Sequence, residues 1–167
     1  MVDFMFYTWG YHLSSLIEHL LLNERATDFE EILLHHFVTQ CLFFCGIFAN
    51  FLPQSVLTLF IHDFSDIFLQ IGKIAASSYF ETAAAVSALP LVVMWTWMRV
   101  CLLGQQAYLL AFEHEYRRAD ETQFQPYLFF SGVFLTIMLC LHVYWLSLML
   151  RIVKRYFGSG TVEDISH

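Results

Sequence analysis

Five ionisable side chains stand inside two neighbouring apolar stretches of the sequence. The stretches cover residues 32–52 and 55–73, and the five residues are His35, His36, His62, Asp63 and Asp66. A charged side chain near the centre of a bilayer costs about 2.5–3.5 kcal/mol on insertion scales, so such residues indicate a functional site. An imidazole serves as a nucleophile or a general base, and a neighbouring carboxylate holds its tautomer and stabilises its cation. The residue types therefore favour chemistry carried out by histidine with carboxylate support.

The spacing of these residues allows the two stretches to share one polar face. Pro53 separates the stretches and predicts a tight turn between two antiparallel helices. Counted outward from that turn at 1.5 Å per residue, Asp66 falls within about two helical turns of the depth of the histidine pair. Thr39 stands one turn from both histidines, and Asp66 leads along its own helix towards Lys73. We therefore expect one site near a membrane interface, built by both helices.

Two other interpretations of the cluster remain open at this point. Buried polar groups also tie membrane helices together through hydrogen bonds without doing chemistry. Histidine and aspartate are also ligands for iron or zinc. Membrane di-iron desaturases, however, carry several HxxxH and HxxHH boxes, and this sequence has one adjacent histidine pair and no such box. We therefore expect no metal site.

The composition predicts a membrane protein. Of the 167 residues, 58% are hydrophobic and 14% are charged, whereas soluble domains carry about 25% charged residues. The net charge of −7 leaves no basic footprint for a nucleic acid partner. The four cysteines all lie in apolar segments and are expected to pack as small apolar side chains. The fold class predicted is an all-α bundle in contact with membrane lipid.

Five hydrophobic segments are long enough to predict about five transmembrane helices. They cover residues 4–22, 32–52, 55–71, 83–103 and 127–152. The third is short for a hydrocarbon core of about 30 Å, so we expect it to rely on protein neighbours. The fourth is expected to continue as an interfacial helix to Phe112. The organisation predicted is one helical domain over residues 1–157 and a short acidic tail over residues 158–167.

Several single residues within these segments have simpler expected roles. Arg99 is the one basic residue deep in an apolar span and is expected to pair with a carboxylate or reach lipid headgroups. His142 and Trp145 are interpreted as packing positions on the last helix. His12 and His19 either face the cluster or pack by polar contacts along the first helix.

The two motifs around the cluster carry a family resemblance. DFEEILLHHFVT (28–39) followed by HDFSDIFLQIGK (62–73) resembles the signature of the ceramide synthases, within the TLC-domain superfamily. WGYHLSSLIEHLL before the signature, the arginine-bearing helix at 97–102 and LHVYWLSLMLRIVKRY (141–156) resemble the family's flanking helices. The resemblance covers most of the chain.

The resemblance implies a fold, a reaction and a set of site residues. It implies a helical bundle around a long apolar tunnel, in the endoplasmic reticulum membrane, without a cofactor. The implied reaction moves a fatty acyl group from acyl-CoA to the amine of a sphingoid base. His35 and His36 would be the catalytic pair, Asp63 and Asp66 would orient and charge-stabilise them, and the supporting residues would be Thr39, His62 and Lys73. The loop at 113–126 falls where the family's acyl-chain length is influenced.

The resemblance also leaves a non-catalytic interpretation open. The family has further membrane helices before the signature, so the chain is expected to be shortened at the N-terminus, with five helices around a tunnel that six would close. In that case the chain is a structural or lipid-binding subunit of a larger membrane complex. A respiratory or ATP synthase assembly of the mitochondrial inner membrane is an example, with other subunits replacing the missing helices. A lipid sensor or transporter is a third possibility.

Overall fold

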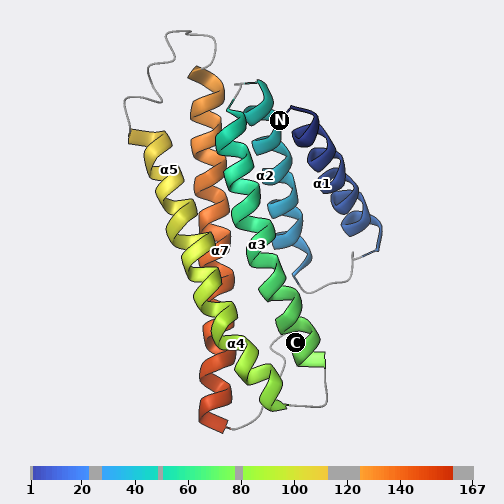
Figure 1. The fold of residues 1–167 in the computed structure, drawn as a ribbon, viewed down its shortest axis with the longest axis vertical. Coiled ribbons are helices and arrows are strands. Elements are labelled where there is room, and N and C mark those ends of the chain that lie inside the picture. The colour runs from blue at the N-terminus through green and yellow to red at the C-terminus, as the bar shows by residue number, and fades with distance from the viewer. Residues whose placement is uncertain (1, 23–27, 49–50, 78–80, 113–124, 160–167) are drawn as a thin grey trace.

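The chain is an all-α integral membrane protein arranged as a bundle (Figure 1). The computed structural model describes residues 2–22, 28–48, 51–77, 81–112 and 125–159. Its helices are α1 (Val2–Leu22), α2 (Phe29–Phe48), α3 (Leu52–Ser77), α4 (Glu81–Trp95), the π-helix η1 (Thr96–Leu102), α5 (Leu103–Phe112) and α7 (Gln125–Ser159). The described residues contain no strand.

The helices form five rods that run in alternating directions. α4, η1 and α5 follow one another without a break and make the fourth rod. α1 begins and α7 ends at opposite ends of the bundle, as an odd number of antiparallel rods requires (Figure 1). α2 packs against α1 and α7, while α3 packs against α4. This order confirms the five helical segments predicted from the sequence.

Three of the five rods are long and apolar enough to cross a membrane by themselves. The three spans are Phe29–Phe48, Val86–Leu110 and Pro126–Arg155. α1 and α3 fall outside this group. α3 carries His62, Asp63 and Asp66, which lower its mean hydropathy. Lipid alone would not favour such a helix, so neighbouring helices have to supply part of its surroundings.

Three predicted features of the segments need correction. The third segment is not short, because α3 has 26 residues and begins at Leu52. Pro53 lies in the first turn of α3 rather than in a turn outside it, where its missing N–H costs no helical hydrogen bond. The extension to Phe112 is helical, but it packs against α7 and, up to Leu110, belongs to a candidate membrane span rather than to a separate helix. The 113–124 loop and residues 160–167 of the tail lie outside the described residues.

Two apolar clusters hold the bundle together. One joins α2, α5 and α7 and consists of Val38, Leu103, Leu135 and Met138. The other joins α1, α2 and α3 and consists of Met5, Phe43 and Leu59. Large side chains elsewhere are exposed along the outside of the rods, as expected for a surface in contact with lipid tails. The two clusters therefore lie where α2 faces α1 and α3 on one side and α5 and α7 on the other.

A glycine permits the close approach of α2 and α3 near their connection. The amide of Phe51 donates to the carbonyl oxygen of Gly46 at 2.9 Å. The side chain of Ser55 lies so close to Gly46 that a Cβ there would overlap its hydroxyl oxygen and stand 3.1 Å from its Cβ. Only a residue without a side chain fits at this position without displacing α3.

We expect Gly46→Ala to destabilise the bundle by about 1–3 kcal/mol, the usual cost of overpacking a tight site. The combination with Ser55→Ala should recover part of the loss, because it removes the hydroxyl that the new methyl group meets. Thermal unfolding in detergent micelles measures both. Gly10→Ala is the matched control, since no atom lies within 4 Å of the added carbon. Equal stability of Gly46→Ala and the unchanged protein would refute the close approach.

Candidate functional site

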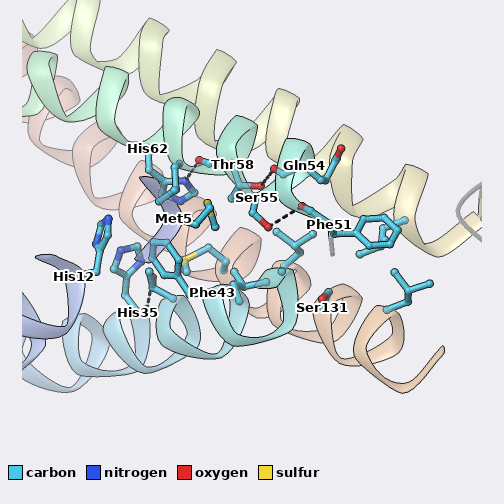
Figure 2. Close-up of a pocket in the computed structure, with 18 of the residues that line it drawn as sticks. Met5, His12, His35, Phe43, Phe51, Gln54, Ser55, Thr58, His62 and Ser131 are labelled. Carbon is cyan, nitrogen blue, oxygen red and sulfur yellow. Dashed lines mark hydrogen bonds between the residues drawn. The ribbon is translucent and has the colours of Figure 1, made fainter. Parts of the chain in front are cut away.

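An elongated cavity runs between α2, α3 and α7, with contributions from α1 and α5 (Figure 2). It encloses about 810 Å³ of space, open solvent included. Its apolar wall consists of Met5, Leu42, Phe43, Phe51, Leu59, Leu110, Leu128, Leu135 and Met138. One end is polar and is lined by His12, His35, His62 and Asp66. The Asp66 side chain is 46% exposed, so the polar end reaches the protein surface.

The cavity has the length of a lipid chain. His35 and Gly46 both line it, and their separation of eleven residues on α2 corresponds to about 16 Å along the helix. On the opposite wall the cavity is lined by His62 of α3 and by Phe51, which directly precedes α3, again eleven residues apart. The ionisable side chains are concentrated at one end, and beyond them mostly apolar side chains line the cavity together with the uncharged polar residues Gln54, Ser55, Thr58 and Ser131. This distribution suits a molecule with a reactive head and a long apolar tail.

His35 lines the cavity and lies beside other imidazoles. Its ring centre lies 6.0 Å from that of His62, 5.7 Å from that of His142 and 5.5 Å from the Trp145 ring. Its Nδ1 atom is buried and has no hydrogen-bond partner among the described residues. Thr39, one turn later, lines the cavity and donates its hydroxyl to the His35 carbonyl oxygen at 2.8 Å. The α2 side of the site is therefore made by His35 and Thr39.

The two histidines of the predicted pair face different neighbours, although their ring centres lie 5.9 Å apart. Neighbouring residues on an α-helix point about 100° apart. His36 consequently turns towards α1, where its ring centre lies 5.6 Å from that of His19. His19 is buried, stacks on Phe29 at 4.8 Å and bonds the Phe29 carbonyl oxygen through Nε2 at 3.1 Å. His36 and His19 thus join α1 to α2 away from the cavity lining.

A second histidine pair links α3 to α7. The Nε2 atoms of His62 and His142 lie 2.8 Å apart, which is a hydrogen bond between the two rings. His62 Nδ1 in turn lies 2.7 Å from the carbonyl oxygen of Thr58. His142 is completely buried. Its role is therefore more than the packing that the sequence predicted, because its ring bonds a cavity-lining histidine.

Arg99 on η1 organises the polar residues of α3. It is buried, and it donates from Nε to the Ser65 hydroxyl at 2.6 Å and from a terminal nitrogen to the His62 carbonyl oxygen at 3.1 Å. The same nitrogen forms an ion pair with the Asp66 carboxylate. The guanidinium also lies 4.2 Å from the centre of the Trp95 ring. The predicted pairing of Arg99 with a carboxylate is confirmed.

The carboxylates do not support the histidine pair as the sequence suggested. Asp66 is bound by Arg99, which holds a carboxylate more strongly than a neutral imidazole does. Asp63 is exposed and interacts electrostatically with His12, Asp66 and Arg99. Within the described parts of the chain, neither carboxylate is hydrogen-bonded to His35 or His36. The physical reason is that a buried guanidinium without a counter-charge is costly, so Arg99 rather than a histidine takes the carboxylate.

The remaining predicted site residues fall at the edge of this arrangement. Lys73 is exposed, about 10 Å beyond Asp66 along α3. His12 lines the polar end of the cavity from α1, and its Nε2 is buried without a hydrogen-bond partner among the described residues. In that part of the chain no three ligating side chains are arranged to hold one metal ion. The histidines lie beside one another as rings rather than around a common point.

We expect Arg99→Met to lower the free energy of unfolding by about 2–3 kcal/mol. Removing one partner of a fully buried pair costs about 3–5 kcal/mol, and the half-exposed Asp66 retains some hydration here. Arg99→Met combined with Asp66→Asn should be more stable than Arg99→Met alone, since no unpaired charge remains. Unfolding in detergent micelles measures the difference. Arg151→Met, at an exposed position on α7, is the control, and an equal effect of both single changes would contradict the assignment.

The sequence was compared with known proteins. The family model described as the TLC domain matches residues 1–151. The ceramide synthase hyl-2 of Caenorhabditis elegans is 26% identical over 95% of the chain, and human ceramide synthase 4 is 30% identical over 92%. The tomato ASC1-like protein is 31% identical over 95%. No solved structure matches the chain.

These matches cover only part of each relative. The aligned region is 51% of the worm protein, 38% of the human protein and 53% of the tomato protein. The chain thus spans about half the length of the curated relatives it matches, or less. The family model nevertheless covers most of the chain, including every described residue of α1, α2, α3, α4, η1 and α5. The chain therefore belongs to the TLC-domain family, in the group that contains the ceramide synthases.

Proposed function

We propose that this protein is an N-acyltransferase that moves a fatty acyl group from acyl-CoA to the amine of a sphingoid base, in the endoplasmic reticulum membrane. The observation that carries the proposal is the position of His35. Its imidazole stands at the polar end of a cavity of lipid length, with a buried nitrogen that has no partner among the described residues. The names of the curated relatives support the same reaction.

The cavity fits the acyl chain of the proposed substrate. A staggered hydrocarbon chain advances about 1.3 Å per carbon, given a C–C bond of about 1.5 Å. The roughly 16 Å between the levels of His35 and Gly46 therefore accommodates about twelve carbons in extended form. Phe51, Leu110 and Leu128 line the cavity at the end opposite the histidines. Burial of each methylene contributes about 0.8 kcal/mol, which retains the substrate in the cavity.

The proposed chemistry passes through an acyl-imidazole. A nitrogen of His35 attacks the thioester carbonyl carbon, the carbon–sulfur bond breaks, and CoA leaves as its thiol with the proton that the imidazole ring gives up. The amine of the sphingoid base then attacks the same carbon, the bond between this carbon and the imidazole breaks, and the amine proton returns to the ring, which leaves as neutral imidazole. Both steps are open to an imidazole, which is a good nucleophile and a good leaving group near neutral pH. His12 and Asp66 line the end at which the amine would arrive.

The two neighbouring histidines, His35 and His36, are expected to contribute unequally to turnover. Purified protein in nanodiscs should form N-acyl product from acyl-CoA and sphinganine. His35→Ala should lower kcat by about 10²–10⁴-fold, the range for a positioned acid–base group, while His36→Ala should cause a much smaller loss because this ring faces α1. Thr136→Ala, at an exposed position on α7, is the control. Full activity of His35→Ala would exclude the proposed mechanism.

The second prediction concerns the length of the acyl chain. Ser131 lines the cavity far from the histidines (Figure 2), so Ser131→Phe should shorten the space available to the chain. We expect the preferred acyl-CoA to become shorter by several carbons, with little change in kcat for the shortest chains. The neighbouring Gly132→Ala meets no atom within 4 Å and serves as the matched control. An unchanged chain-length profile would show that the acyl chain lies elsewhere.

One observation favours a second candidate function. Asp66 is bound to Arg99, and the polar atoms of α3, η1 and α7 bond mainly to one another. Such a network also suits a non-catalytic, lipid-binding subunit of a larger membrane complex, whether in the endoplasmic reticulum or in the mitochondrial inner membrane. The nanodisc assay with acyl-CoA and sphinganine separates the two candidate functions. A protein that retains lipid in the cavity, loses it in Ser131→Phe and yet forms no product would support the second.

A further inference from the structure

His142 and His62 form a hydrogen bond that allows only one arrangement of protons in the neutral pair. Their Nε2 atoms are 2.8 Å apart, so one of these nitrogens carries the proton and the other accepts it. His62 Nδ1 lies 2.7 Å from the Thr58 carbonyl oxygen. A carbonyl oxygen only accepts hydrogen bonds, so the proton of His62 has to be on Nδ1.

The positions of the other ring protons follow from the placement of the His62 proton on Nδ1. With its proton on Nδ1, neutral His62 has a bare Nε2, which accepts the bond between the rings. His142 therefore carries its proton on Nε2 and donates it to His62. Its own Nδ1 is then bare, in agreement with the finding that this buried atom has no hydrogen-bond partner among the described residues. The chain of donors runs from His142 through His62 to Thr58.

The backbone around both rings is held in place by the same network. The Trp95 indole donates to the carbonyl oxygen of His142 at 3.1 Å. Arg99, which lies over the Trp95 ring at 4.2 Å, donates to the carbonyl oxygen of His62 at 3.1 Å. The two imidazoles are therefore fixed at the ring and at the main chain. Little rotation of either ring is possible without breaking one of these bonds.

We infer that His142 is a positioning residue for the reaction: by donating to the bare Nε2 of His62, whose tautomer the Thr58 carbonyl oxygen sets, it holds the His62 ring in place beside His35. This inference rests on the proposed function. The His35 ring centre lies 5.7 Å from that of His142 and 6.0 Å from that of His62. With Nδ1 bound to Thr58 and Nε2 bound to His142, His62 has no free nitrogen for the substrate. Of His35, His62 and His142, we therefore expect His35 to be the one that reacts with the substrate.

A pair of substitutions at position 142 tests the inference through turnover. His142→Leu removes the donor, whereas His142→Gln supplies an amide N–H near the place of Nε2–H. We expect His142→Leu to lower kcat by about 10- to 100-fold, as loss of an outer hydrogen-bond partner of a functional imidazole typically does. KM for acyl-CoA should stay nearly constant, because the cavity wall is intact. His142→Gln should recover most of kcat.

The control separates positioning from simple loss of stability. His19 is also buried and bonds a carbonyl oxygen, but it lies between α1 and α2 outside the cavity. His19→Leu should lower the unfolding temperature and leave kcat near that of the unchanged protein. Equal losses of kcat in His142→Leu and His142→Gln, or a loss that follows unfolding temperature across all three variants, would overturn the inference.

A second readout does not depend on turnover. Nitrogen-15 NMR of histidine-labelled protein in nanodiscs distinguishes a protonated from a bare ring nitrogen. We expect His62 to carry its proton on Nδ1 in all three proteins, and its bare Nε2 to show a shifted resonance in His142→Leu, where the donor is lost, but not in His142→Gln. A His62 proton on Nε2 in the unchanged protein would overturn the inference. If the unchanged protein forms no product but His62 behaves as expected, the proposed function fails while the pairing of the two histidines stands.

Discussion

The fold and the site both depend on one buried cation. A guanidinium removed from water needs a counter-charge and partners for its N–H groups, or it costs several kcal/mol. Arg99 obtains these from α3 alone, through Asp66, Ser65 and the carbonyl oxygen of His62. Arg99 also lies over Trp95, whose indole bonds α7 at the carbonyl oxygen of His142. One side chain thereby sets the relative positions of α3, the η1 rod and α7.

Because Arg99 needs a counter-charge and hydrogen-bond partners, the polar residues around it have different roles. Asp66 forms an ion pair with Arg99, so its carboxylate serves the guanidinium rather than a histidine. His62 and His142 are hydrogen-bonded to each other, and the ring of His62 lines the polar end of the cavity. His35 is left with a buried nitrogen that has no hydrogen-bond partner within the described ranges of the chain, at the head of the cavity. The π-helical turns of η1 accompany this arrangement, which fits the frequent occurrence of such turns at functional sites.

The sequence predicts the rods and the location of the cluster because both follow from local patterns. Apolar runs near twenty residues specify helices, and Pro53 marks the beginning of the third rod. The side of the helix that each residue occupies is not local information. His35 and His36 are adjacent in sequence, and only the packing of α1 and α7 decides that His35 faces the cavity. His142 is 80 residues from His62, and no spacing rule connects them. The sequence signal for His142 is that a histidine occurs inside an apolar helix.

In the proposed reaction His35 carries the acyl group between the thiol of CoA and the amine. The most direct measurement is to mix the protein with acyl-CoA in the absence of a sphingoid base, stop the reaction with acid, digest the protein and determine the masses of its peptides. We expect an added acyl mass on the peptide that contains His35, which is lost when sphinganine is added before the acid and is absent from His35→Ala. An acyl mass on a different residue, or product formation with no acyl-enzyme and full activity in His35→Ala, would contradict it.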